Sequence, residues 1–233
     1  MIRMIETTTR RRFLMSVAAI PALSLLAACS KGENGEAQAD ETITTAATAP
    51  ESTGTVDMAK LLEPGSLPDQ AQGPEDAPVT IVEYASMTCP HCAHFHETTY
   101  PALKEKYINT GKVRFILREF PFDPRAEAGF MLARCTEGKY FPMIDVLFKQ
   151  QNNWAAVQDA RTALLNIAKI AGFTQESFEA CLTNQKLLDD VRAMRARGAE
   201  FGVDSTPTFF INGKKYPGAM SIEQMSAIID PLL

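Results

Sequence analysis

The chain has 233 residues, of which 45% are hydrophobic, so it is long enough for one core with an inserted subdomain or for two small domains. Its formal net charge is −5, and because residues 1–28 hold four arginines and one glutamate, the part after residue 28 carries −8. This acidity argues against nucleic acid as a partner, since binding to phosphates requires a basic surface.

The first residues have the pattern of an export signal. Arg10, Arg11 and Arg12 precede an apolar stretch from Phe13 to Ala28, which is too short for a comfortable transmembrane helix. Arginines followed by Phe and Leu resemble a twin-arginine signal, and an arginine-rich Sec signal would look similar. We therefore expect export, which places the mature protein in the periplasm or the cell envelope.

The end of this signal, residues 26–29, resembles a bacterial lipobox with Cys29 as the lipidated residue. Acyl chains on Cys29 would attach the protein stably to a membrane. The alternative is cleavage at residues 37–39, an A-x-A pattern that would release a soluble protein. Residues 29–57 have few bulky aliphatic side chains, which predicts a disordered tether or a leader without function.

Two cysteines three positions apart, in Cys89-Pro90-His91-Cys92, lie between a predicted strand and a predicted helix. The free N–H groups and the dipole of a helix N-terminus favour a thiolate, and Pro90 fits the first turn. We assign Cys89 as the nucleophile, because it lies at the outer edge of that turn, and Cys92 as the resolving thiol. His91 adds a donor or a positive charge beside the sulfur, which favours an oxidising protein.

A zinc site is an alternative for the same cysteines, because His94 and His96 follow closely. On a helix these two histidines point to different faces, and the chain has no second Cys-x-x-Cys, so four convergent ligands are hard to build. Haem attachment is excluded, because Ala93 and not histidine follows Cys92. We expect no metal and no other catalytic cofactor.

The expected elements around this motif begin with a βαβ unit, continue as helices with apolar stripes, and close with a strand and a helix. Ser221 and Gln224 form the pattern of a capping box at the start of the last helix. In chain order we predict a strand at 79–84, a helix at 93–106, a strand at 112–117, helices at 126–148, 159–171 and 187–195, a strand opened by Pro207, and a helix at 221–232.

A second functional pattern lies near the end of the chain. Thr206-Pro207 precedes an apolar run and then Asn212-Gly213, a dipeptide typical of a hairpin turn. A cis bond before Pro207 would let this strand approach the dithiol and leave backbone groups free to bind an incoming chain. An ordinary trans proline is the alternative, and the presence of the two paired cysteines favours the cis form.

Residues 77–84, the cysteine motif and residues 206–213 together resemble the DsbA-like thiol:disulfide oxidoreductases of the bacterial cell envelope. The resemblance covers about residues 58–233. It implies an α/β protein with a thioredoxin fold interrupted by an inserted helical domain. The thioredoxin fold would comprise residues 58–124 and 202–233, and the insert residues 125–201.

The resemblance also implies roles for individual residues. Thr206 and Pro207 would form a cis-proline loop beside the redox pair. Glu83 resembles the buried acidic residue beneath the dithiol, a proton acceptor for Cys92, and Arg118 is a candidate basic partner for it. Threonine before the proline is found in oxidases of this type and also in isomerases and reductases, so the direction of electron flow is open.

We expect an enzyme that gives disulfide bonds to exported proteins with free thiols. By the same resemblance, a DsbB-like, quinone-linked membrane partner would reoxidise it. The alternatives are an envelope isomerase or reductase with the same dithiol chemistry and, more remotely, the zinc-binding protein. No dimerisation domain is evident between the tether and Val79. This speaks against the isomerase or reductase and so favours the oxidase.

Two further cysteines, Cys135 and Cys181, lie in the predicted helical insert. In an oxidising compartment two remaining thiols are ordinarily joined, so we predict a structural disulfide between them. Such a bridge stabilises the fold by restricting the unfolded chain. Two buried free thiols are the alternative.

Overall fold

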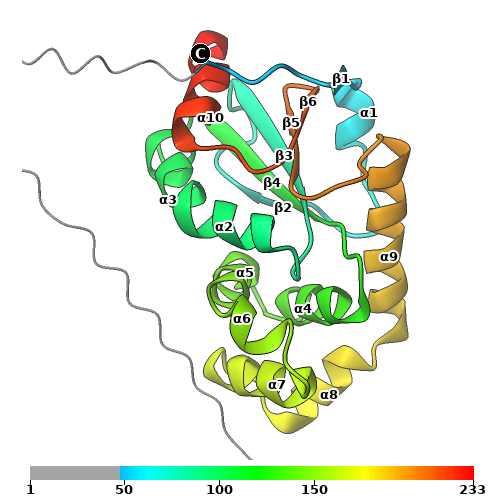
Figure 1. The fold of residues 1–233 in the computed structure, drawn as a ribbon. Helices are drawn as coiled ribbons and strands as arrows, with labels where there is room; N and C mark the ends of the chain where they lie inside the picture. Colours follow the sequence, from blue (N-terminus) through cyan, green and yellow to red (C-terminus); the bar gives the residue numbers. More distant parts are fainter. Residues whose placement is uncertain (1–47) are drawn as a thin grey trace, which may run out of the picture. The chain divides into compact units, whose positions relative to one another are not determined.

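The computed structural model describes residues 48–233; the predicted export signal, Cys29 and most of the predicted tether lie outside the described residues. The described part has a six-stranded sheet with helices on both faces (Figure 1). A group of further helices, inserted between the fourth and fifth strands, lies at the end of the sheet where the two parallel strands finish (Figure 1). The fold is therefore α/β with a helical insertion.

The sheet has the strand order β1-β6-β5-β3-β4-β2. Only β3 and β4 are parallel, and the other neighbours are antiparallel. The turn between β5 and β6 has positive φ at Asn212 and Gly213, as the dipeptide predicts. The strands are β1 Gly54–Thr55, β2 Gln70–Gln72, β3 Val79–Ala85, β4 Val113–Glu119, β5 Thr208–Ile211 and β6 Lys214–Pro217.

Helices cover both faces of this sheet and build the insert. Among residues 48–233, no helix is both long and apolar enough to cross a bilayer. The helices are α1 Met58–Leu62, α2 Pro90–Thr98, α3 Tyr100–Leu103, the π-helix η1 Lys104–Ile108, α4 Pro124–Arg134, α5 Tyr140–Lys149, α6 Gln151–Trp154, α7 Ala160–Ile170, α8 Gln175–Leu182, α9 Gln185–Glu200, α10 Ile222–Ile229 and the short η2 Asp230–Leu232.

Side chains alternate along β3, so the two faces of the sheet have separate cores. Ile81 and Ala85 pack on the face covered by α2, α3 and α10. Val82 and Tyr84 pack on the opposite face with α1 and the segment after α9. By the same alternation Glu83 points toward α2, inside the first core, where a carboxylate needs a partner.

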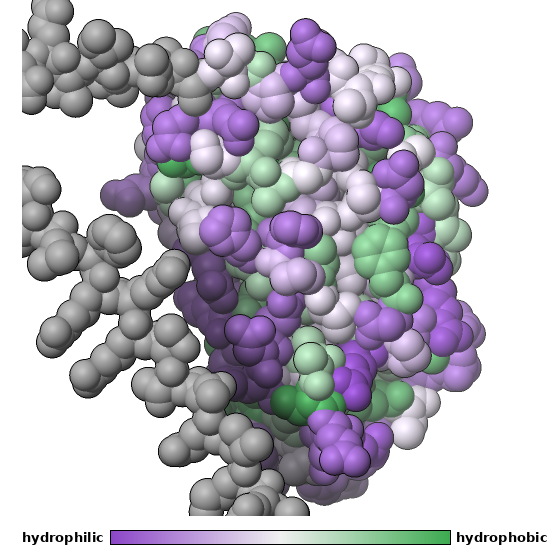
Figure 2. Space-filling view, in the orientation of Figure 1, coloured by the Kyte–Doolittle hydropathy of each residue, from purple (hydrophilic) through white to green (hydrophobic). Residues whose placement is uncertain are grey.

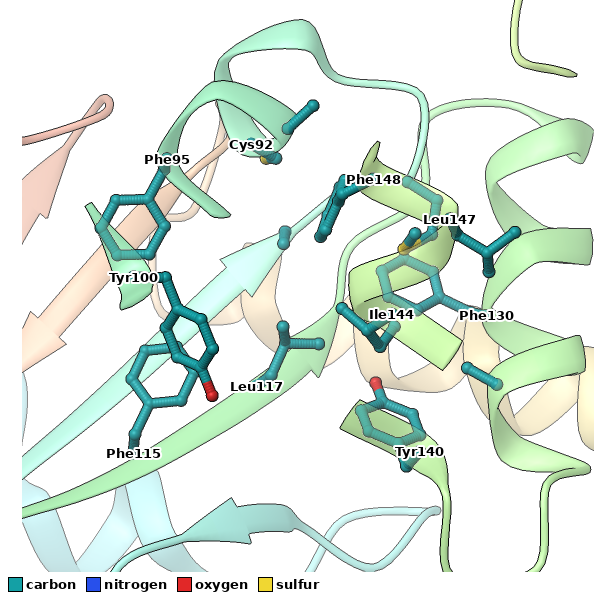
Figure 3. Close-up of a cluster of buried hydrophobic side chains, with 14 of the residues drawn as sticks. Cys92, Phe95, Tyr100, Phe115, Leu117, Phe130, Tyr140, Ile144, Leu147 and Phe148 are labelled. Atoms are coloured by element: carbon teal, nitrogen blue, oxygen red, sulfur yellow. The ribbon is translucent and has the colours of Figure 1, made fainter. Parts of the chain in front are cut away.

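The insert is joined to the first core by apolar packing. Figure 3 shows Ile144, Leu147 and Phe148 of α5 between Leu117 of β4 and Phe130 of α4. On the outer surface, hydrophilic side chains surround small apolar areas on the face drawn in Figure 2. The α5 helix is thus the element that fixes the insert against the end of the sheet.

Cys135 and Cys181, the pair predicted to be bridged, form a disulfide with their Cα atoms 6.2 Å apart. Cys135 is the C-cap residue of α4, and Cys181 lies in α8. The bond therefore joins the first and one of the last helices of the insert. Of the cysteines in the described part, Cys89 and Cys92 are the free ones.

Two predicted boundaries near the redox motif differ from the structure. The last residues of the range 29–57, which we predicted to be a tether, belong to the fold, because Gly54–Thr55 pair with β6 and Asp57 caps α1. The helix predicted at 93–106 begins at Pro90 and is divided after Thr98. It is divided because Pro101 has no N–H to donate to the preceding turn.

The helix predicted at 126–148 is in fact two helices, α4 and α5. The chain turns between them at Gly138, which has φ of +68° and so adopts a conformation that favours glycine. The α8 helix was not predicted, since Thr174 is paired with Ser177 in its capping box instead of the usual Glu or Gln.

Candidate active site

Cys89 lies at the junction between the end of β3 and the start of α2. It is the N-cap residue of α2, with extended backbone angles, and Pro90 occupies the first helical position. Its carbonyl accepts the N–H of Ala93 at 3.1 Å, which begins the helical hydrogen bonds. The Cys89 side chain is half-buried and that of Cys92 is fully buried, so only Cys89 can meet another protein.

The cis-proline loop lies directly beside Cys89. The Thr206–Pro207 bond is cis, and the Sγ atom of Cys89 lies 3.2 Å from the Thr206 carbonyl oxygen. The loop is brought there by the sheet, because Thr208 of β5 pairs with Tyr84 of β3. The structure thus brings together residues from the two ends of the predicted thioredoxin fold.

The two thiols have opposite electrostatic environments. A hydrogen bond from the Cys92 thiol lowers the pKa of Cys89 to about 5, with further hydrogen bonds from the Thr206 side chain and the backbone N–H groups of Cys92 and His91. Burial raises the pKa of Cys92, and hydrogen bonding to Cys89 and the charge of Glu83 add to this. Near neutral pH, Cys89 is therefore a thiolate and Cys92 a thiol.

Glu83 has a different partner from the one predicted. Its Oε2 lies 2.9 Å from Nε2 of His96, and both side chains are buried. The imidazole stacks on Phe148, with ring centroids 4.5 Å apart. His96 follows Cys92 by four positions, so the two share one face of α2, a pattern by which the sequence could have identified it.

Arg118 is not the partner of Glu83, and that prediction was wrong. It lies on the opposite face of the sheet, because β4 side chains alternate like those of β3. Its guanidinium forms a bidentate ion pair with Asp69 at 2.8 and 2.9 Å. It also donates hydrogen bonds to the Tyr84 hydroxyl and the Leu61 carbonyl. The role of Arg118 is therefore structural, because its side chain supplies the donors for these buried groups.

Gln151 contacts the redox motif and was missed by the sequence analysis. From α6 of the insert, its Nε2 donates to the carbonyls of Met87 and Cys89 at 2.9 and 3.0 Å. Thr88 is held in addition by a 2.5 Å hydrogen bond to Asp123. The insert therefore fixes the loop before α2, and no local pattern around Gln151 indicates this.

The other histidines of the motif point outward. His91 and His94 are exposed, and His91 acts on Cys89 through its backbone N–H. Within the part of the chain that the structure describes, no three His, Cys, Asp or Glu side chains are grouped as metal ligands would be. The arrangement at α2 is that of a dithiol, with one reactive and one buried sulfur.

Comparisons with known proteins place this site in a family. A family model described as thioredoxin matches residues 66–231. The solved structure of α-DsbA1 from Wolbachia pipientis is 33% identical with a TM-score of 0.69, and the match covers 74% of this chain and 94% of that one. BdbD from Bacillus subtilis, at 18% identity and a TM-score of 0.64, shares the fold, with 79% of this chain and 98% of that one covered.

Curated proteins give a consistent result. A Rickettsia bellii protein with a provisional name as a protein-disulfide oxidoreductase is 35% identical over 167 residues, which are 70% of this chain and 63% of that protein. A similarly named Rickettsia typhi protein is 34% identical over 170 residues, which are 71% of this chain and 62% of that protein. The chain thus spans about three fifths of the length of these curated relatives.

Proposed function

Because this chain belongs to the DsbA-like, thioredoxin-fold family of protein-disulfide oxidoreductases, we propose that it donates disulfide bonds to exported proteins through Cys89 and Cys92. The observation that carries the proposal is the position of the half-buried Cys89 at the N-terminus of α2 and beside the cis-proline loop, where hydrogen bonds lower its pKa to about 5. A thiolate this stable stabilises the reduced protein relative to its disulfide form. A protein with a stable reduced form is a strong oxidant.

The reaction begins with the Cys89–Cys92 disulfide. A substrate thiolate attacks Cys89, the bond between the two enzyme sulfurs breaks, and its electron pair leaves with Cys92, which is then protonated. The substrate is now held on Cys89 by a mixed disulfide, with the Thr206 carbonyl alongside to accept a backbone N–H. Only the half-buried sulfur of Cys89 can be attacked by a substrate thiolate in this step.

A second substrate thiolate then attacks the substrate sulfur of the mixed disulfide. The new bond joins two substrate cysteines, and Cys89 leaves as a thiolate with the electron pair. A low pKa makes Cys89 a good leaving group, so the hydrogen bonds to its sulfur favour release of oxidised substrate. The enzyme is left as a dithiol that needs an external oxidant.

For that oxidant we propose a DsbB-like, quinone-linked membrane protein, and for the location the periplasm or cell envelope. Support comes from the export signal predicted in residues 1–28 and from the family. A lipid on Cys29 would keep the enzyme near such a partner. Mass spectrometry of the mature N-terminus tests the lipid, and a terminus after residue 39 would contradict it.

The test of the activity uses a synthetic peptide with two cysteines. Oxidised protein should convert it to the cyclic disulfide with one disulfide transferred per enzyme, and Cys89→Ser should abolish the transfer. Thiol trapping in cells gives the direction, because a donor is mostly oxidised at Cys89–Cys92. A mostly reduced pair would support the isomerase or reductase, and stoichiometric zinc without peptide oxidation would overturn the proposal.

A further inference from the structure

In the proposed reaction the Cys92 sulfur gains or loses a proton, although the side chain is not accessible to solvent. Cys92 and Glu83 both have no exposed surface. When Cys92 attacks a mixed disulfide on Cys89, its proton cannot go to Cys89, because that sulfur is bonded to the substrate. The Glu83 carboxylate points toward α2, and its negative charge raises the pKa of Cys92, so we take it as the base that receives this proton. A proton on Glu83 must still leave the core.

His96 is the group through which it can leave. Its Nε2 is 2.9 Å from Glu83 Oε2, and although its side chain is almost fully buried, His96 is one of the residues that line a surface cavity of about 450 Å³ between α3, η1 and α5. The other ring nitrogen, Nδ1, is buried and has no hydrogen-bond partner among residues 48–233. Imidazole can accept a proton on one nitrogen and release the other, so the ring connects the core to the cavity.

Tyr100 also lines this cavity but is not suited to the task. Its hydroxyl donates to Gln72 Oε1 at 2.8 Å, away from Glu83. Burial raises the pKa of Tyr100, and the negative charges of Glu83 and Asp145 raise it further, so the phenol keeps its proton. The charged and titratable groups around His96 are Glu83, Cys92, Tyr100, Tyr140, Lys104, Glu105, Asp145 and Lys149.

We propose that His96 carries protons between Glu83 and the cavity lined by Tyr100, Lys104 and Asp145, and so sets the rate at which Cys92 gains or loses its proton. This proposal rests on the proposed dithiol function. His96 does not touch the reacting sulfurs, so it is a positioning residue that acts through Glu83. Its stacking on Phe148 fixes the ring for both contacts.

The proton and electron changes balance in both directions. When Cys92 attacks the mixed disulfide, its S–H proton passes to Glu83, a Cys92–Cys89 bond forms, and the substrate leaves as a thiolate with the electron pair. The proton then passes through His96 to solvent in the cavity. When a substrate opens the enzyme disulfide, Cys92 leaves as a thiolate and the proton moves inward by the same route.

The test isolates the step in which Cys92 loses its proton. The reduced protein is treated at low pH with oxidised glutathione, so that Cys89 attacks its disulfide, keeps one glutathione as a mixed disulfide and releases the other as a thiol. The pH is then raised, and release of the bound glutathione is followed by acid quench. We expect His96→Gln, which keeps an amide near Glu83 but cannot carry a proton, to slow release about 10- to 100-fold and to change its pH profile. The matched control is His94→Gln, an exposed position on the same helix.

A second readout separates proton transfer from loss of structure. Alkylation of Cys89 by iodoacetamide requires an intact helix N-terminus but no proton transfer through His96, so its rate should stay within about twofold in every variant. In His96→Ala, added imidazole should restore glutathione release, whereas pyrazole, a much weaker base of similar shape, should not. Rescue distinguishes a proton carrier from a residue that merely fills space.

Two results would overturn the relay. One is release from His96→Gln at the wild-type rate at every pH; the other is a folded His96→Ala protein that imidazole does not rescue. Failure of the relay differs from failure of the proposed function. If wild-type protein oxidises the two-cysteine peptide and His96→Gln matches it, the function stands without the relay. If wild-type protein does not oxidise the peptide, the function itself is wrong.

Discussion

The Sγ atom of Cys89 lies 3.2 Å from the carbonyl oxygen of Thr206, although the two residues are 117 positions apart. The contact forms because β5 is hydrogen-bonded to β3, the strand that leads into the redox motif. One consequence is that the properties of Cys89 depend on both ends of the thioredoxin fold. A helix N-terminus alone would give it fewer hydrogen-bond donors than the complete site does.

The first prediction concerns pH. The pKa of Cys89 is about 5 in the folded protein and about 9 when unperturbed, so between these values the folded reduced protein binds fewer protons than the unfolded chain. Stability of the reduced protein should therefore rise from pH 5 to pH 9, and this gain is lost as the pH falls through about 5. Ultraviolet thiolate absorbance should show a midpoint near 5.

Chemical denaturation of reduced and oxidised protein across this range provides the check. The difference in stability between the two forms should shift toward the reduced form as the pH rises. Cys89→Ser, which has no thiolate at this position, should not show the rise in stability that reduced wild-type protein shows between pH 5 and pH 9. A thiolate midpoint near that of an ordinary cysteine would contradict the assignment of Cys89 as the activated sulfur.

The second prediction concerns Gln151. Gln151→Ala removes two hydrogen bonds and leaves the buried carbonyl of Met87 without its donor, so the variant should lose about 1–3 kcal/mol of stability. It should also transfer disulfides more slowly, because the loop before α2 is held less firmly. Gln150→Ala, next to it in the chain and with no side-chain hydrogen bond in the described structure, is the control and should do neither.

The third prediction concerns Arg118. Arg118→Met leaves Asp69 without its cation and the buried Tyr84 hydroxyl without a partner, which should cost about 3–5 kcal/mol in denaturant unfolding. Arg114→Met, on the same strand but paired with an exposed Glu75, should cost less than about 1 kcal/mol. The thiolate titration of Cys89 should not change in either variant. A changed titration would mean that Arg118 acts on the dithiol after all.

The fourth prediction concerns the second disulfide. Because Cys135 and Cys181 are 46 positions apart, replacing both by alanine should lower stability by about 4 kcal/mol. Cys89→Ser/Cys92→Ser protein, which keeps the Cys135–Cys181 bridge, should lose a similar amount when a reductant is added. Alkylation of Cys135 and Cys181 in the native protein without reductant would show that the bridge is absent.

The features that could be predicted from the sequence are those formed by residues close together in the chain. The spacing of Cys89 and Cys92, the Asn212-Gly213 turn and the start of the last helix depend on neighbouring residues, and each has a direct physical cause. These features, with the family resemblance, were enough to predict the α/β class and the helical insertion.

The contacts that tune the site were not predicted. His96 instead of Arg118 pairs with Glu83, because the alternation of side chains along β4 places Arg118 on the other face of the sheet. Gln151 reaches Cys89 from a helix whose position depends on the packing of the whole insert. The contact of Gln151 is determined by tertiary packing and has no periodic pattern in the sequence, whereas strand alternation and the i, i+4 spacing of Cys92 and His96 could have indicated the other two.

The position of β5 in the middle of the sheet affects how the protein folds during its synthesis. During synthesis, the ribosome produces Cys89 and Cys92 long before residues 208–211, which must pair with β3 on one side and with the later strand β6 on the other. A nascent, truncated or clipped chain without those residues carries both sulfurs but has no finished centre. A proteolytic fragment of this kind therefore lacks the loop that lies beside the Cys89 sulfur in the complete fold.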